Sequence, residues 1–314
     1  MRLPSFLLAL CVPCLPGLFW GATAGPLVRE HVAADAKWLI HLDLDAFRET
    51  QLGGLVFRQF LDEQINKVTQ GLKDQFEIDF DSKQIHGVTA YGLDFKQPEK
   101  MTGVVVIETD LDVVAGLDAI LEKAGPDAHN APFERLQQQP FPMYATKDGV
   151  VGGALAKGVF VLARKQEHLE RARRVFTGQA DSLSSAKSGP QTAAPAAGFL
   201  TISVLDAALA GAGLPPQVRV LKDAQGAQVV AAEKADKIFV SAELQTKDAE
   251  VATQIQQALQ GAIALAKLSE LPDQDLKQLA ESAKVSGREN TVTLDLQVPI
   301  EMVSRKMIAK KRRG

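Results

Sequence analysis

The chain has 314 residues, of which 46% are hydrophobic and 6% aromatic, and its formal net charge at pH 7 is −3. This charge excludes a protein that relies on a generally basic surface to bind nucleic acid. Both cysteines, Cys11 and Cys14, lie in the first 24 residues, so a chain without that segment has no disulfide, thiol nucleophile or cysteine-bound metal.

The first 24 residues have the features of a signal peptide. Arg2 precedes the apolar run FLLALCVPCLPGLFW, and the small residues Ala22 and Ala24 come just before Gly25. The run is shorter than the ~20 residues that a membrane-spanning helix needs. The sequence therefore predicts cleavage after Ala24, export to the periplasm or the medium, and a cysteine-free mature chain that is not integral to the membrane.

The first predicted elements after the signal are a strand, WLIHLDL, and a short helix from Asp45 that Gly53 and Gly54 end or kink. A longer helix is predicted for 55–72 because apolar residues recur there at three- and four-residue spacing. The members of that stripe are Phe57, Phe60, Leu61, Ile65, Val68 and Leu72.

Paired strands and two further helices complete the first half. The runs IHGVTAYGLDF and TGVVVIETD predict two strands, followed by a helix over 111–123, and Asp148-Gly149 predicts a tight hairpin before the strand GVFVLAR. The helix QEHLERARRVF closes this half. Its predicted buried side consists of Leu169, Ala172, Val175 and Phe176.

The second half repeats these ingredients after a low-complexity stretch rich in Ser, Ala, Gly and Pro, which predicts a linker or long loop. FLTISVL predicts a strand and AQVVAAEKADKIFVSAELQT a hairpin. A long helix is predicted for 248–268 and a second for 273–284, then the alternating strand NTVTLDLQV and a final helix from Pro299. The expected inward residues of the long helix are Val251, Ile255, Leu259, Ile263 and either Leu265 or Leu268.

Together these elements predict an α+β fold of two similar halves, with antiparallel sheets covered by helices on one face. The predicted segments are a signal peptide (1–24), an N-terminal α+β unit (25–178), a linker or loop (179–197), a C-terminal α+β unit (198–304) and a basic tail (305–314).

The stretch WLIHLDLDAF suggests a metal site. On a continuous strand His41, Asp43 and Asp45 would share one face, where an imidazole and two carboxylates could bind a divalent metal, with His86 or His31 as an additional ligand. The alternative is that Asp45 caps a helix and Asp43 is solvated or ion-paired. A metal-assisted hydrolase is the enzymatic hypothesis that this set supports.

The last ten residues, RKMIAKKRRG, hold six of the 35 basic residues. Setting aside those six and Arg2 leaves 28 basic against 38 acidic residues, so the body of the chain is acidic. The tail could bind an anionic surface, or it could complement the negative end of a helix dipole, and nucleic acid is disfavoured. The candidate surface residues are Arg305, Lys306, Lys310, Lys311, Arg312 and Arg313.

At AADAKWLIHLDLDAFRETQLGG, VFVLARKQEHLERARRVFTG and VSGRENTVTLDLQVP the chain resembles a group of exported bacterial proteins of unknown function. This resemblance implies an exported α+β architecture and carries no catalytic residue. The chain also lacks the Gly-x-Ser-x-Gly, His-Glu-x-x-His, phosphate-loop and Gly-x-Gly-x-x-Gly motifs. These observations favour non-enzymatic binding or scaffolding in the cell envelope, with no cofactor and with a ligand and partner that the sequence does not name.

Overall fold

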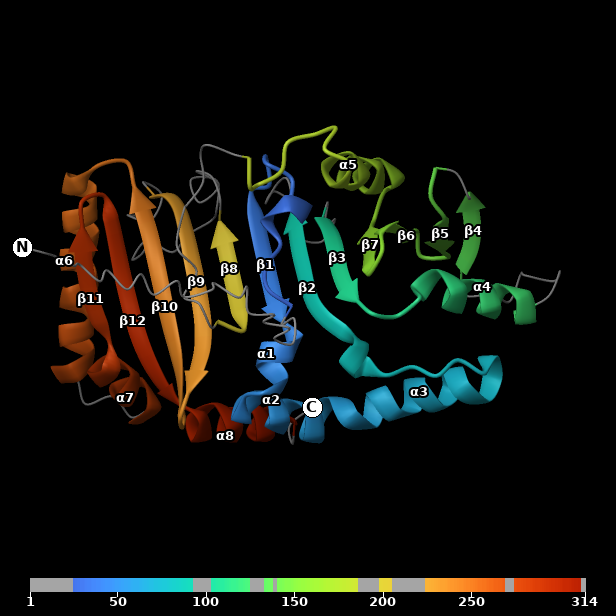
Figure 1. The fold of residues 1–314 in the computed structure, drawn as a ribbon. Coiled ribbons are helices and arrows are strands. Elements are labelled where there is room, and N and C mark those ends of the chain that lie inside the picture. The colour runs from blue at the N-terminus through green and yellow to red at the C-terminus, as the bar shows by residue number, and fades with distance from the viewer. Residues whose placement is uncertain are drawn as a thin grey trace, which may run out of the picture.

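A computed structural model describes residues 25–92, 103–124, 133–137, 140–185, 198–204, 224–268 and 274–311. They form a long antiparallel sheet with helices packed against it (Figure 1). The predicted signal peptide and residues 186–197 of the predicted linker lie outside the described residues. Within the described part, no helix has the length and apolar character needed to cross a membrane.

The strands fall at the runs that the sequence predicts, except for 133–137 and 284–288, which were not predicted as strands. In chain order they are β1 Trp38–Asp43, β2 Ile85–Gly92, β3 Gly103–Thr109, β4 Phe133–Gln137, β5 Met143–Thr146, β6 Val151–Ala156, β7 Val159–Ala163, β8 Leu200–Val204, β9 Ala224–Lys234, β10 Lys237–Thr246, β11 Lys284–Arg288 and β12 Thr291–Pro299.

The helices lie between groups of strands. They are α1 Leu44–Arg48, α2 Gln51–Val56, α3 Asp62–Phe76, α4 Val113–Ala124, α5 Gln166–Phe176, α6 Ala249–Leu268, α7 Gln274–Ser282 and α8 Ile300–Lys311. Two short 3₁₀ turns, η1 Arg29–His31 and η3 Ser82–Gln84, and a π-helical segment, η2 Phe57–Leu61, which joins α2 to α3, complete the set.

The strands of both predicted halves join in one 12-stranded sheet, in the order β11-β12-β10-β9-β8-β1-β2-β3-β7-β6-β5-β4. At its centre β1 pairs antiparallel with β2 on one side and with β8 on the other. The prediction of a separate sheet in each half is therefore corrected. Alternation along a strand indicates which face is buried, but it does not indicate which strand pairs with which.

Helices cover both faces of the first half, and so the prediction of a single covered face is wrong there. Met143 and Tyr144 are neighbours on β5 and point to opposite faces. Met143 packs with Leu169 of α5 in the largest apolar cluster, whereas the Tyr144 hydroxyl donates a 2.6 Å hydrogen bond to Asp118 of α4. Both side chains are buried, which requires cover on both sides.

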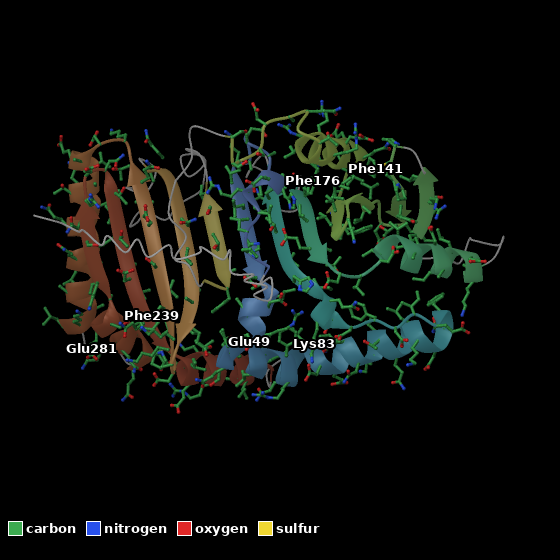
Figure 2. All side chains as sticks on the ribbon, viewed as in Figure 1. Glu49, Lys83, Phe141, Phe176, Phe239 and Glu281 are labelled. Atoms are coloured by element: carbon green, nitrogen blue, oxygen red, sulfur yellow. The ribbon has the colours of Figure 1, made fainter. Side chains whose placement is uncertain are left out.

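The largest apolar cluster lies between α5 and the strands of the first half. Leu169, Ala172 and Val175 of α5 are buried as predicted. Phe176, which stacks on His31 with ring centroids 4.2 Å apart, and Phe141 lie at the same end of the molecule as α5 (Figure 2). The helical period of QEHLERARRVF therefore identified the buried side of α5 correctly.

The first part of the predicted linker is docked on this core. The amide of Leu183 donates a 2.7 Å hydrogen bond to the carbonyl of Val32, and Ser182 forms an antiparallel bridge with Ala33. Leu183 itself is buried. One large apolar residue in a run of small and polar ones is enough to anchor the loop, because its burial contributes ~1.5–3 kcal/mol.

The last two turns of α6 differ from the prediction. Val251 and Ile255 are buried and Leu259 is packed beside them, as expected. Leu265 and Leu268, however, are 70% and 83% exposed. A helical period indicates which side of a helix is apolar, but not how far the neighbouring sheet extends beneath it.

The predicted break at Gly53 and Gly54 also lies elsewhere. Both glycines are inside α2, and the helix boundary falls at Thr50, whose extended backbone and side chain cap α2 by accepting a 2.8 Å hydrogen bond from the Gly53 amide. The apolar stripe predicted for 55–72 is helical, but α3 contains no buried residue and Val68 is exposed.

Candidate functional site

The three predicted metal ligands lie where β1 changes into α1. His41 and Asp43 are on β1 and both are buried, in agreement with the alternation. The strand ends at Asp43, however, and Asp45 belongs to the first turn of α1. Because the residue period changes from two to 3.6 at this point, Asp45 does not continue the row formed by the other two.

Each of the three side chains has its own partner. His41 Nδ1 lies 2.9 Å from Thr89 Oγ1, Asp43 Oδ1 accepts a 2.8 Å hydrogen bond from the Ala46 amide, and Asp45 pairs with Arg48. No group of three His, Cys, Asp or Glu side chains within the described residues is arranged to hold a metal ion. The metal-site prediction is therefore corrected to a buried histidine, a helix cap and a partly buried ion pair.

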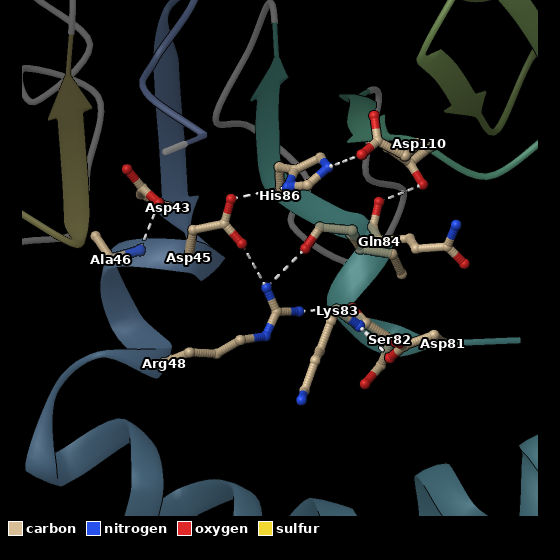
Figure 3. Close-up of polar contacts among 12 residues, drawn as sticks. Asp43, Asp45, Ala46, Arg48, Asp81, Ser82, Lys83, Gln84, His86 and Asp110 are labelled. Atoms are coloured by element: carbon tan, nitrogen blue, oxygen red, sulfur yellow. Dashed lines mark hydrogen bonds and ion pairs between the residues drawn. The ribbon is translucent and has the colours of Figure 1, made fainter. Parts of the chain in front are cut away.

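Asp45 instead belongs to a network of charged residues that connects α1, β2 and the end of β3 (Figure 3). His86 Nδ1 lies 2.8 Å from Asp45 Oδ2, and His86 Nε2 lies 2.9 Å from Asp110 Oδ2. A neutral imidazole has one N–H and could donate to only one of these carboxylates. The arrangement therefore fits the imidazolium form, which donates to both.

The pKa of His86 follows from the same contacts. Burial lowers the pKa, but the hydrogen bonds and charges of Asp45 and Asp110 outweigh burial and raise it above its ordinary value. Protonated His86 thus connects the first turn of α1 to the loop that follows β3. A pKa raised in the folded state stabilises the fold at low pH, and this contribution is lost as the pH rises through the folded-state pKa.

Arg48 fixes the other side of the network. Its Nη1 donates to Asp45 Oδ1 at 2.8 Å and to the Ile85 carbonyl at 2.9 Å, and its Nη2 donates to the Ser82 carbonyl at 2.6 Å. The guanidinium also lies over the ring of Phe57, 5.5 Å from its centroid. The planar fork of arginine can serve several acceptors at once, so α1 is held firmly against the start of β2.

His41 has the opposite electrostatic character. Burial lowers its pKa, and the opposing influences of Glu108, Asp43 and the Gly25 backbone do not overcome this. The ring is therefore neutral near pH 7. It contributes no positive charge to balance the two carboxylates that lie near it.

A cavity of about 450 Å³ adjoins the charged network. It lies between the start of α4 and the β6–β7 hairpin, and Asp110 belongs both to its wall and to the network. Most of its lining is apolar, with Asp110, Asp112 and Lys157 as the charged members. The lining residues are Thr109, Asp110, Leu111, Asp112, Val113, Val114, Ala154, Ala156, Lys157, Gly158, Val159 and Phe160.

The predicted surface-binding residues are only partly described. Arg305 and Lys306 of α8 both approach Asp275 of α7, with N–O distances of 2.9 and 3.3 Å. Lys310 and Lys311 are the last described positions of α8, without described side chains, and Arg312 and Arg313 lie outside the described residues. Two of the six bases are thus positioned by an acidic partner.

The sequence reasoning missed Arg48, Glu108 and Asp110. Asp45 and Arg48 have the i,i+3 spacing of a helical ion pair, which was a usable signal. Asp110 and Glu108 carry no such signal, because they reach the network and the buried histidine only through the pairing of β2 with β3.

No family model matches the chain, and no curated protein is detectably similar to it. Solved structures do share its fold. Crystal form IV of TP0453 matches with a TM-score of 0.52 and 9% sequence identity, and the match covers 92% of this chain and 98% of that one. Crystal form III matches with a TM-score of 0.52 and 8% sequence identity, covering 90% of this chain and 98% of that one. At this identity the likeness concerns the fold alone.

Proposed function

We propose that the chain is exported to the cell envelope and acts there by binding or scaffolding, without catalysing a reaction. The observation that carries the proposal is the cavity beside α4, whose size and mostly apolar lining suit a small ligand or a side chain of a partner. The charged groups next to it support binding over catalysis, because Arg48 and His86 are engaged by fixed protein partners. The signal-like first 24 residues support export, as does the resemblance to exported bacterial proteins of unknown function.

The cavity can be tested with the dye 1-anilinonaphthalene-8-sulfonate, whose rings suit an apolar wall and whose sulfonate suits Lys157. We expect saturable binding by fluorescence titration, and Ala154→Trp, which fills the cavity, should raise the dissociation constant at least about tenfold. Ala258→Trp, on the exposed side of α6, is the matched control. Equal weakening by both substitutions, or by neither, would contradict a binding site in the cavity.

We also propose that the two halves derive from one duplicated unit. In support, the first half contains the strand order β1-β2-β3-β7-β6 and the second half the order β8-β9-β10-β12-β11. In each half a helix follows the third strand, α4 in one and α6 in the other. The hairpin strands β4 and β5 are then an addition to the first half.

A second candidate function is peripheral binding to an anionic surface through the basic tail. The observation in its favour is an exposed leucine beside the first two bases of the tail: Leu276 is 49% exposed and follows Asp275, which pairs with Arg305 and Lys306. Apolar side chains beside basic ones are the combination that binds lipid headgroup regions.

This candidate predicts salt-sensitive co-sedimentation with phosphatidylglycerol vesicles and none with phosphatidylcholine vesicles. Removing the residues after Ile308 deletes four bases at ~1 kcal/mol each, so binding should fall at least about tenfold. The control replaces two exposed bases elsewhere, Lys67→Gln and Lys73→Gln. Unchanged binding after the truncation would rule out the tail as the binding element.

A further inference from the structure

Gly87 leaves an opening on the face of the sheet that bears His41. In the strand register Gly87 lies between Asp43 of β1 and Glu108 of β3. A Cβ atom at Gly87 would lie 2.8 Å from Glu108 Oε2 and 3.0 Å from the Gly25 carbonyl oxygen. The opening over Gly87 is thus occupied by the backbone of Gly25, with a carboxylate on either side.

Gly25 fits closely in this position. It is buried, and a Cβ atom on it would lie 2.3 Å from the carbonyl oxygen of His86, which is backbone and cannot move aside. A residue with a side chain would therefore have to withdraw from β2. We refer to Gly25, His41, Asp43, Gly87 and Glu108 as the Gly25 socket.

The socket combines the carboxylates of Asp43 and Glu108 with buried atoms that make no hydrogen bond. Among the described residues, buried atoms with no hydrogen-bond partner include Glu108 Oε1, His41 Nε2 and His31 Nδ1. His31 Nδ1 lies 3.5 Å from Glu108 Oε1 without forming a hydrogen bond, and His41 is neutral because burial lowers its pKa. The Glu108 side chain is 14% exposed and its Oε1 atom makes no hydrogen bond, so a cationic donor placed beside this carboxylate would stabilise it.

Gly25 is also the residue that cleavage after Ala24 would place at the start of the mature chain. Before cleavage its nitrogen is a neutral amide with one N–H. After cleavage it is an ammonium group with three N–H donors and a positive charge. Proteins commonly bind terminal amines in this way, with oxygen acceptors around the ammonium.

We propose that the socket binds the α-ammonium group of the mature chain, so that removal of the signal adds a cationic partner beside Glu108 and Asp43. This inference rests on the proposed export, because it requires cleavage after Ala24. It assigns the socket a role in maturation, because the ammonium group becomes available to the two carboxylates only after the signal has been removed.

The test compares the chain that begins at Gly25 with one that retains Ala24 as a single additional residue. The extended chain should melt at least about 5 °C lower, because its amine is displaced from the socket. Since the extra residue could also act sterically, the comparison is repeated with Glu108→Gln in both chains. An ion pair requires the difference in melting temperature to shrink by at least about half, whereas a steric effect leaves it unchanged.

Glu122→Gln, a substitution at an exposed position of α4, serves as the matched control. It should leave the difference in melting temperature between the two chains unchanged. Equal melting temperatures of the two chains, or a difference that Glu108→Gln does not reduce, would overturn the proposal. N-terminal sequencing of the exported protein tests export separately. A mature chain that begins at Gly25 but shows no stabilisation would refute the socket and leave export intact.

Discussion

Replacing Leu169 by alanine is expected to lower the free energy of unfolding by about 2–5 kcal/mol. Leu169 is fully buried in the largest apolar cluster, where α5 packs on the first half of the sheet, so its loss removes apolar contacts and leaves a cavity. Urea unfolding followed by circular dichroism would measure the change.

The matched control for this prediction is Leu268→Ala, the same substitution at an exposed position of α6. It should change stability by no more than about 0.5 kcal/mol. A similar loss at both positions would mean that the end of α6 is covered in solution, and a loss below ~1 kcal/mol at Leu169 would mean that α5 is not packed as described.

Replacing Gly53 by alanine is expected to destabilise the fold by about 3 kcal/mol or more. The added Cβ atom would lie 1.8 Å from the carbonyl oxygen of Phe47 and 2.9 Å from Thr50 Oγ1. Both atoms belong to the tight junction between α1 and α2, so the junction would have to open. Thermal and urea unfolding of the variant give the measurement.

The matched control is the glycine in α3. At Gly71 an added Cβ atom meets nothing within 4 Å, and Gly71→Ala should stabilise the protein by about 0.5–1 kcal/mol, because alanine loses less backbone entropy in a helix. The same substitution in two helices thus has opposite expected signs. Equal signs would show that the α1–α2 junction is looser than described.

The sequence predicted most of the local structure, since periodicity reports on the immediate environment of a chain segment. The buried side of α5 and the strand β1 followed directly from residue spacing. The same reasoning failed at Asp45, where strand alternation was extended one step into a helix. It also failed at Gly53, where the glycine allows a close approach by Phe47 and does not end the helix.

The parts that could not be predicted depend on pairing between distant segments. Glu108 reaches His41 because β3 and β1 lie on either side of β2, and Asp110 reaches His86 because β3 pairs directly with β2. The exposure of Leu265 and Leu268 depends on where the sheet ends, which no local pattern records. The candidate cavity likewise combines the start of α4 with a hairpin some forty residues later.

The pairing of β1 with β8 has a consequence for how the chain reaches its native state. Leu42 is paired with Leu200, so the central ladder can close only after more than 150 residues have been made. If the chain emerges N-terminus first, one edge of β1 therefore stays unpaired until β8 has also emerged. Unpaired strand edges promote aggregation. Ladders of such high contact order also form slowly. The unpaired edge of β1 is thus the part of the folding chain that a chaperone would most need to shield from aggregation.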